Sequence, residues 1–276
     1  MRITVRHDTW YNYSVPVGLA PHTLRLSPRL DHASLVWQQL NIDPWPSWRS
    51  DTIDDAGNAI THAEFSGLFS VLTISSQFEL NAYGPPMLID PGLPPLPWPT
   101  RVGDRLDPYR HEPFADPSVA QFAELICWQA GHFPLGFIQA LCNDLYNRVF
   151  RHDRIYGLAE LPATTLANQE GACRDITVLF IAACRHLGIP ARFVSGYYAP
   201  PGSPAGQRQL HAWPEVWLPG MGWRGWDPTN GIMTTEGHVA LCTAADQAST
   251  MPIDGGFIAN GVTATLNYSI QMSTGP

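Results

Sequence analysis

The stretch that decides the fold covers residues 171–190 and reads GACRDITVLFIAACRHLGIP. Counting from Ile176, apolar residues recur at i, i+3, i+4, i+7 and i+11, which is the spacing of one face of an α-helix. Gly188 and Pro190 are residues that typically end a helix. Because the segment is apolar on nearly every side, it predicts a central helix that is buried in the core of the protein.

Cys173 lies in the first turn of this predicted helix. The unpaired N–H groups and the positive end of the helix dipole at such a position stabilise a thiolate. Arg174 adds a positive charge, and Asp175 opposes it as a first-turn charge or helix cap. Cys173 is therefore a candidate nucleophile, and the alternative is a small buried apolar residue.

A second candidate, His211, opens the sequence HAWPEVWL, whose two-residue alternation predicts a strand. Asp227 follows on the return strand of a predicted hairpin. A symmetric four-residue loop would place Asp227 on the face opposite to His211. A three-residue loop over residues 219–221 would place it opposite Trp213, on the face of His211 and diagonal to it. An interaction between His211 and Asp227 therefore requires a loop of odd length or a compensating bulge.

These three residues together support one chemistry. A Cys173 thiolate would attack a carbonyl carbon, His211 would transfer the proton, and Asp227 would fix the imidazole tautomer. The N–H of Cys173 would be one oxyanion donor. Gln169 and Trp213 are the candidates for a second donor, and for both a plain structural role is the simpler interpretation.

The composition excludes several other classes of enzyme. The chain has 276 residues; its 16 cationic residues are all arginines, and its 24 acidic residues give a net charge of −8. Without lysine, a Schiff-base lysine, a Walker-A loop and a kinase lysine are ruled out. Nucleic acid is not an expected partner, because neutralising phosphates requires clustered positive charge.

The chain divides into three parts by pattern. Residues 1–84 alternate with a two-residue period between turn signals, which predicts an antiparallel β-sandwich. Residues 85–115 begin with a proline-dense run, which predicts an extended linker or wrapping arm. Residues 116–276 form the predicted catalytic domain and open with two helices, over 118–129 and 134–151. The expected fold class is α+β.

Membrane and metal partners are not indicated. The N-terminal residues lack an apolar signal region, and no apolar run approaches about 18 residues, so we expect a cytoplasmic protein with no membrane partner. Five widely spaced cysteines argue against a disulfide framework and against a paired-cysteine zinc or redox site. Four of the other histidines show no recognisable metal-ligand spacing: His132, His152, His186 and His238.

Several motifs in order carry a family resemblance: GACRD at 171–175, RHLGIPARFVSGY at 185–197, HAW at 211–213, GW at 222–223 and DPT at 227–229. Together they resemble the transglutaminase-like superfamily of cysteine enzymes. Residues 11–17, 24–29 and 55–58 resemble the β-rich N-terminal region of one bacterial branch of that superfamily. Ile176 and Thr177 depart from the family pattern, in which an aromatic and a small residue are expected there.

The resemblance implies a papain-like core, in which the cysteine helix packs on an antiparallel sheet that carries the histidine and the aspartate. It implies the catalytic residues Cys173, His211 and Asp227, no metal, and no organic cofactor. The substrate would be a peptide or a protein. The first hypothesis is a cysteine-dependent hydrolase that cleaves peptide or amide bonds through a thioester. The alternatives are a transglutaminase-type acyltransferase that forms isopeptide bonds, and a non-catalytic peptide-binding module.

Overall fold

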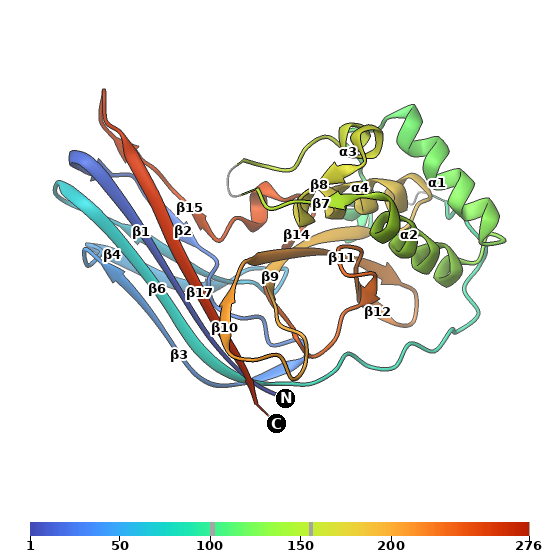
Figure 1. The fold of residues 1–276 in the computed structure, drawn as a ribbon, viewed down its shortest axis with the longest axis horizontal. Helices are drawn as coiled ribbons and strands as arrows, with labels where there is room; N and C mark the ends of the chain where they lie inside the picture. The colour runs from blue at the N-terminus through green and yellow to red at the C-terminus, as the bar shows by residue number, and fades with distance from the viewer. Residues whose placement is uncertain (100–102, 155–156, 276) are drawn as a thin grey trace.

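The computed structural model describes residues 1–99, 103–154 and 157–275. Its largest sheet contains long strands from both ends of the chain, which lie side by side in Figure 1. All of its pairings are antiparallel. The order of the strands is β10 (Gly206–Arg208), β17 (Ala264–Gly275), β1 (Arg2–Leu19), β6 (Phe69–Ala82) and β3 (Ala33–Asp43), and β16 (Phe257–Ile258) also pairs with β1.

A smaller sheet packs against the first one. Every second residue of β6 from Leu72 to Ala82 is buried, which is the pattern of a strand with one face on a core. Residues of both sheets, such as Leu72 and Leu24, share this core. The two sheets therefore form the expected β-sandwich. The order of the smaller sheet is β15 (Ile253–Asp254), β2 (His22–Leu24), β5 (Ala59–Glu64) and β4 (Trp48–Ile53).

The last strand of the chain completes the sandwich. β17 pairs with β1 along almost its whole length, from Arg2 opposite Gly275 to Tyr13 opposite Ala264. Residues 116–276, expected from the sequence to form the catalytic domain, therefore contribute strands to the sandwich as well. This pairing joins segments about as far apart as the chain allows, and no local pattern in the sequence reports it.

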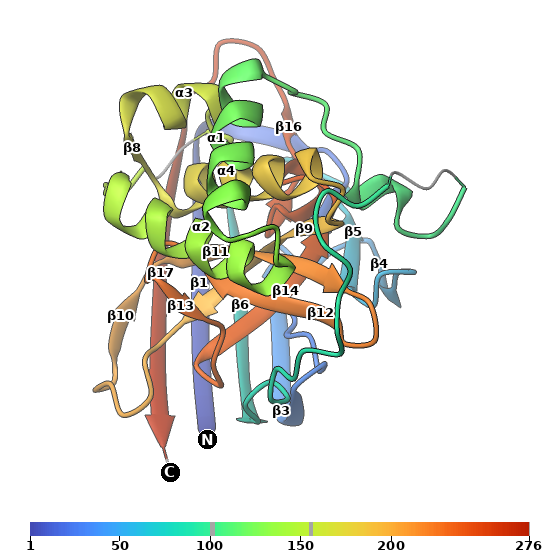
Figure 2. The ribbon, with the colours of Figure 1, turned by 90° about the vertical axis from the view of Figure 1, so that its right-hand side faces the viewer.

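A second unit, which we call the α+β unit, contains a five-stranded antiparallel sheet with helices gathered on one side of it (Figure 2). The buried helix α4 packs on strands β11 and β9, as expected. The strand order is β13 (Ile232–Met233), β12 (Gly222–Asp227), β11 (Leu210–Leu218), β9 (Ala191–Tyr198) and β14 (His238–Ala244). The helices are α1 (Pro117–Gln129), α2 (Pro134–Arg148), α3 (Pro162–Asn168) and α4 (Cys173–His186).

The helix boundaries follow from local chemistry. The Asp116 carboxylate accepts a hydrogen bond from the N–H of Ser118 at 2.8 Å, and Pro117 occupies the first helical position of α1. Helix α2 ends at Arg148, three residues before the expected end. The sequence patterns missed α3, β4 and β5, which are short elements without a clear period. The remaining elements are a parallel pair of β7 (Phe150–Arg151) with β8 (Glu170–Gly171), and the 3-10 turns η1 (Asp107–Tyr109) and η2 (Ala248–Thr250).

The proline-rich segment wraps the α+β unit. Leu96 is buried in the core of that unit, and its N–H donates to the carbonyl of His132 at 2.9 Å. The N–H of Trp98 donates to the carbonyl of Leu187, at the end of α4, also at 2.9 Å. Gly188 next to it has a φ of 79°, and a Cβ there would lie 2.2 Å from the Trp98 carbonyl oxygen. Only glycine therefore allows this close approach.

A buried polar cluster fastens the sandwich to the α+β unit. The side chain of Asn58 donates to the carbonyl of Thr243 on β14 at 2.9 Å and accepts from its N–H at 2.8 Å. The Arg29 guanidinium donates to the same Asn58 oxygen at 2.6 Å, and the N–H of Arg29 donates to the Ala240 carbonyl at 2.8 Å. Strand β14 is therefore held from both sides, by β9 and by the sandwich.

Among the helices of the described residues, none combines the length and the apolar character that crossing a bilayer requires.

Candidate active site

Cys173 is the first residue of α4, and the start of this helix is fixed by Asp175. The buried Asp175 carboxylate accepts from the N–H of Ala172 at 2.7 Å and binds Arg154 at 2.5 Å. A Cβ at Gly171 would lie only 2.9 Å from the Cβ of Asp175. Asp175 therefore acts as a helix cap, as expected. The N–H groups in the first turn of α4, around Cys173, have no carbonyl partner within the helix and point away from its N-terminal end.

His211 and Asp227 are brought together by the hairpin β11–β12. Leu218 pairs with Gly222 and Trp217 with Trp223, so the loop has three residues, 219–221. This is the register that an interaction between His211 and Asp227 requires, and the prediction of an odd loop is confirmed. The Nε2 atom of His211 lies 2.7 Å from Oδ2 of Asp227.

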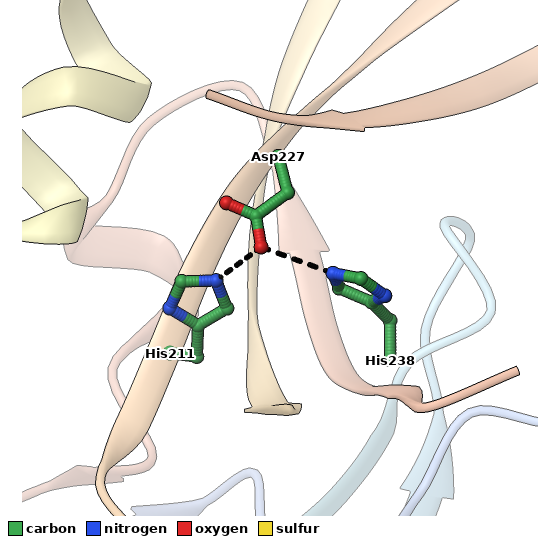
Figure 3. Close-up of side chains that lie close together, drawn as sticks. All are labelled: His211, Asp227 and His238. Carbon is green, nitrogen blue, oxygen red and sulfur yellow. Dashed lines mark hydrogen bonds and ion pairs between the residues drawn. The ribbon is translucent and has the colours of Figure 1, made fainter. Parts of the chain in front are cut away.

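The carboxylate of Asp227 is fully buried and surrounded by donors. Oδ1 accepts from the N–H groups of Thr229 at 3.0 Å and Asn230 at 3.2 Å. Oδ2 accepts from the Asn230 amide at 2.6 Å. The same oxygen accepts from His211 and from Nε2 of His238 at 3.1 Å (Figure 3). Burial raises the pKa of Asp227, but the hydrogen bonds from His211 and His238 and the positive charge of His211 outweigh burial and hold the pKa well below its usual range. Asp227 is therefore an anion at every working pH.

His211 also lies close enough to Cys173 for the two side chains to interact, and both line the same cleft. Because Nε2 of His211 faces Asp227, Nδ1 is the ring nitrogen left for the sulfur. Burial lowers the pKa of His211, but the hydrogen bonds and negative charges of Asp227 and Cys173 outweigh it and raise this pKa to about 10. The arrangement therefore favours an imidazolium at His211, which lies between the Cys173 side chain and a buried carboxylate.

The cysteine opens onto a cleft of about 900 Å³ between the two units. Cys173 and His211 lie on one wall, which belongs to the α+β unit. The opposite wall comes from the sandwich, through strands β1 and β17. The volume suits a peptide segment or a side chain of similar size. The sandwich residues on the opposite wall are His7, Thr9, Tyr11, Leu266 and Tyr268.

Neither residue considered as a second oxyanion donor is among the described residues that line this cleft. Gln169 is exposed and ends α3 in a left-handed conformation with a φ of 54°. Trp213 is 2% exposed and packs edge-on against His238. Near the hairpin loop, the guanidinium of Arg192 lies over the ring of Trp223 at 4.2 Å.

The cluster of His211, Asp227 and His238 also has the composition of a metal site. Its three ligand atoms lie within 4.8 Å of one another. The N–H of Thr235 donates to Nδ1 of His238 at 3.0 Å, so Nε2 of His238 carries the proton and donates to Asp227. A protonated Nε2 has no lone pair for a metal ion. The hydrogen-bond pattern therefore fits a proton-transfer site and does not fit a metal centre.

Two site residues were not found from the sequence. Asn230 follows Asp227 by three residues in a turn, where an asparagine commonly binds nearby backbone or carboxylate groups. His238 lies beside Asp227 because β14 pairs with β9, with His238 opposite Tyr198. Its place in the turn after Asp227 could therefore have identified Asn230 from the sequence as a residue that binds Asp227. For His238 no local pattern exists, because its place depends on the strand order.

The other cysteines are buried and differ from Cys173, which is partly exposed. Burial raises the pKa of Cys142 to about 12, helped by the charge of Asp227. Burial also raises the pKa of Cys242 to about 11 and the pKa values of Cys127 and Cys184. Only Cys173 therefore combines access to solvent with a basic partner.

Several proteins are similar to this chain over nearly its full length. An uncharacterised protein of Mycobacterium tuberculosis is 27% identical over 295 residues, covering 98% of this chain and 92% of its own. One of Mycobacterium leprae is 24% identical, covering 95% of each. A solved structure from Cytophaga hutchinsonii, named as a candidate cysteine protease, matches with a TM-score of 0.71 at 16% sequence identity. The match covers 99% of this chain and 90% of that protein, so the two proteins share the fold.

A shorter match is to a protein with a named activity. A protein-glutamine gamma-glutamyltransferase of Pseudomonas aeruginosa is 34% identical over 105 residues, which is 33% of this chain and 16% of that protein. Residues 130–228, which include Cys173, His211 and Asp227, match the model of the transglutaminase-like superfamily. Residues 3–81 match the bacterial transglutaminase-like N-terminal region. The chain therefore belongs to the transglutaminase-like superfamily and carries its bacterial N-terminal region.

Proposed function

We propose that the protein is a cysteine-dependent hydrolase that cleaves peptide or amide bonds through a thioester acyl-enzyme. The observation that carries this proposal is the order of three side chains at the wall of a large cleft: Cys173 lies beside His211, and His211 is hydrogen-bonded at 2.7 Å to the buried Asp227. Each member has the state that its role needs: an accessible thiol, a histidine with a raised pKa, and a carboxylate that stays ionised.

Acylation follows from this geometry. The Cys173 thiolate attacks the substrate carbonyl carbon while His211 holds a proton on each ring nitrogen. The Nδ1 proton passes to the leaving amine, and the Nε2 proton remains on the hydrogen bond to Asp227. Asp227 does not need to accept a proton, because five donors surround its two oxygens. The first-turn N–H groups of α4 stabilise the negative charge that develops on the carbonyl oxygen.

Deacylation reverses these roles. Neutral His211 removes a proton from the second nucleophile, which attacks the thioester and releases Cys173. Water gives hydrolysis, and a primary amine gives an isopeptide or amide bond. The two reactions therefore share Cys173, His211 and Asp227 and differ in which molecule reaches the thioester first.

Acyl transfer to an amine is the second candidate function. The 34% identity to a protein-glutamine gamma-glutamyltransferase over 105 residues favours it. The absence of lysine is compatible with it, because the chain offers no lysine side chain that the enzyme could modify in itself. Hydrolysis is the first proposal because water is always present at the thioester, whereas transfer also requires a site for an amine.

The test uses glutamine-containing peptides with a label, with and without a primary amine. Release of glutamate-containing product in both conditions, dependent on Cys173, supports the hydrolase. Incorporation of the amine supports the transferase. Absence of both reactions over a broad peptide library, together with peptide binding, would leave the fold as a binding module and refute both enzymatic proposals.

Two variants make the test specific. Cys173→Ala removes the nucleophile and should abolish product formation. Cys184→Ala, on the same helix but buried in the core, should retain activity. The location in the cytoplasm stays a prediction, which fractionation of cells that produce the native protein would check.

A further inference from the structure

The Asp227 carboxylate has a second histidine partner that the reaction above does not use. His238 donates from Nε2 to Oδ2 of Asp227 at 3.1 Å, the same oxygen that His211 binds at 2.7 Å (Figure 3). Its side chain is 2% exposed, and it comes from strand β14, whereas His211 comes from β11 and Asp227 from β12. Side chains from three strands of one sheet therefore meet at a single carboxylate oxygen.

The neighbours of His238 fix its protonation and its orientation. The N–H of Thr235 can only donate, so Nδ1 of His238 accepts and the proton sits on Nε2. Burial lowers the pKa of His238, and its hydrogen bond to Asp227 only partly opposes this, so His238 stays neutral. Its ring stacks on Tyr198 at 4.1 Å between centroids and meets Trp213 edge-on at 5.1 Å. His238 is thus a rigid, uncharged donor.

The titratable groups around His238 come from several elements. Asp227 binds it from β12, the His211 ring lies 6.3 Å away on β11, and the Tyr198 ring stacks on it from β9. A small cavity behind it, between the sandwich and the sheet, is lined by further charged or titratable residues, namely Arg29, Asp31, His32, Glu215 and Glu236.

His238 is one of the donors that fix the rotation of the Asp227 carboxylate. The two N–H groups of the turn after Asp227 hold Oδ1, and His238 with the Asn230 amide holds Oδ2. Oδ2 is therefore presented to His211 even before His211 is protonated. Without His238, one of the three donors to Oδ2 is lost and the carboxylate can turn away from the histidine.

We propose that His238 is a positioning residue for the Cys173–His211 pair, and that it acts through Asp227 as a neutral hydrogen-bond donor from β14. This rests on the proposed function, because it assumes that Cys173 and His211 form the reactive pair. It also gives the sandwich a role in the chemistry, since Arg29 and Asn58 fasten the strand that carries His238.

The test measures the alkylation rate of Cys173 by iodoacetamide from pH 5 to pH 9, followed by mass spectrometry, which needs no substrate. The variants are His238→Leu, which removes the donor, and His238→Gln, which restores a donor at a similar reach. His186→Leu, at the exposed end of α4, is the matched control. Circular dichroism and thermal unfolding establish that each variant is folded.

We expect His238→Leu to slow alkylation about 10-fold at pH 6 and less than about twofold at pH 9, where an ordinary thiol ionises without help. His238→Gln should return the rate at pH 6 to within about threefold of wild type, and His186→Leu should match wild type. A pH profile of His238→Leu that superimposes on wild type would overturn the inference. So would a Gln variant as slow as the Leu variant.

A second measurement does not depend on the variants folding. The ¹⁵N chemical shifts of the wild-type histidines should show His238 as the neutral tautomer with its proton on Nε2 at pH 7. A proton on Nδ1, or a charged His238 at pH 7, overturns the inference. Failure of the proposed function looks different: the wild-type alkylation profile itself would then be that of an ordinary thiol, whatever the state of His238.

Discussion

Replacing Asp227 by Asn tests the His211–Asp227 pair with almost no change in shape. Oδ1 accepts from the backbone N–H groups of Thr229 and Asn230, which cannot reverse their direction, whereas the Asn230 side-chain amide at Oδ2 can turn its own oxygen inward; the oxygen of the new amide is therefore held at the Oδ1 position. Its NH₂ group then occupies the position of Oδ2, faces Nε2 of His211, and no longer accepts the hydrogen bond from His238. An NH₂ group can only donate, so His211 must accept at Nε2 and carry its proton on Nδ1, toward Cys173.

The size of the effect follows from the pKa of His211. Its rise from 6.5 to about 10 corresponds to about 5 kcal/mol in favour of the imidazolium, at about 1.4 kcal/mol per pKa unit. If Asp227 supplies roughly half of this, its loss lowers the population of the ion pair about 60-fold. An ordinary thiol is about 0.3% ionised at pH 6, which limits the loss of alkylation rate to about 300-fold. The estimated loss of the ion pair and this upper limit together give an expected decrease in the alkylation rate on the order of 100-fold at pH 6.

The assay is the rate of Cys173 alkylation by iodoacetamide at pH 6 and at pH 9, measured on folded protein. Asp227→Asn should be about 100-fold slower than wild type at pH 6 and close to it at pH 9. Amide hydrolysis should fall by about 10³–10⁴-fold, because the tautomer is wrong for a base. Asp55→Asn, on the exposed turn of the sandwich, is the matched control. Equal alkylation of Asp227→Asn and wild type at pH 6 would refute the reasoning.

Three further predictions concern the rest of the molecule. Iodoacetamide at pH 7 should label Cys173 before the other four cysteines, which are buried with raised pKa values, and comparable early labelling of Cys142 would contradict this. Asn58→Ala should lower the free energy of unfolding in urea by about 3 kcal/mol, because it leaves the Thr243 N–H and C=O unpaired, whereas Asp55→Ala should change it by less than about 0.5 kcal/mol. Burial lowers the pKa of His7 to about 4, so between pH 6.5 and pH 4 the unfolded chain binds a proton that the native protein does not bind. The free energy of unfolding of wild type, relative to that of His7→Gln, should therefore fall by about 1.4 kcal/mol per pH unit over this range. A difference that does not change with pH would show that His7 is not buried as a neutral group.

Much of the site could be predicted because its determinants are local. The period from Ile176 and the Gly188 stop define α4, and Asp116 with Pro117 defines the start of α1. The His211–Asp227 pairing follows from the register of one hairpin, since a three-residue loop is enough to place both side chains on one face. Such patterns act over a few residues, where the geometry of helices and strands is fixed.

The remaining features depend on contacts between distant parts of the chain. His238 meets Asp227 only because β14 lies beside β9, and β17 joins the sandwich through a partner more than 250 residues away. The expected second oxyanion donors, Gln169 and Trp213, were proposed without knowing which residues face the cleft. Strand order and tertiary packing decide these positions, and neither leaves a periodic signal in the sequence.

The two units of the fold meet at the reactive centre and at the cleft. The family segment at residues 130–228 contains Cys173, His211 and Asp227 but ends before His238, the second histidine on the Asp227 carboxylate. It also lacks β1 and β17, which form the opposite wall of the cleft. His7 on β1 hydrogen-bonds Tyr197 on β9 at 2.8 Å, so this wall is fixed to the strand beside His211. Because the orientation of Asp227 and the shape of the cleft both come from outside the family segment, we expect full activity to require the whole chain, with the sandwich acting as part of the active site.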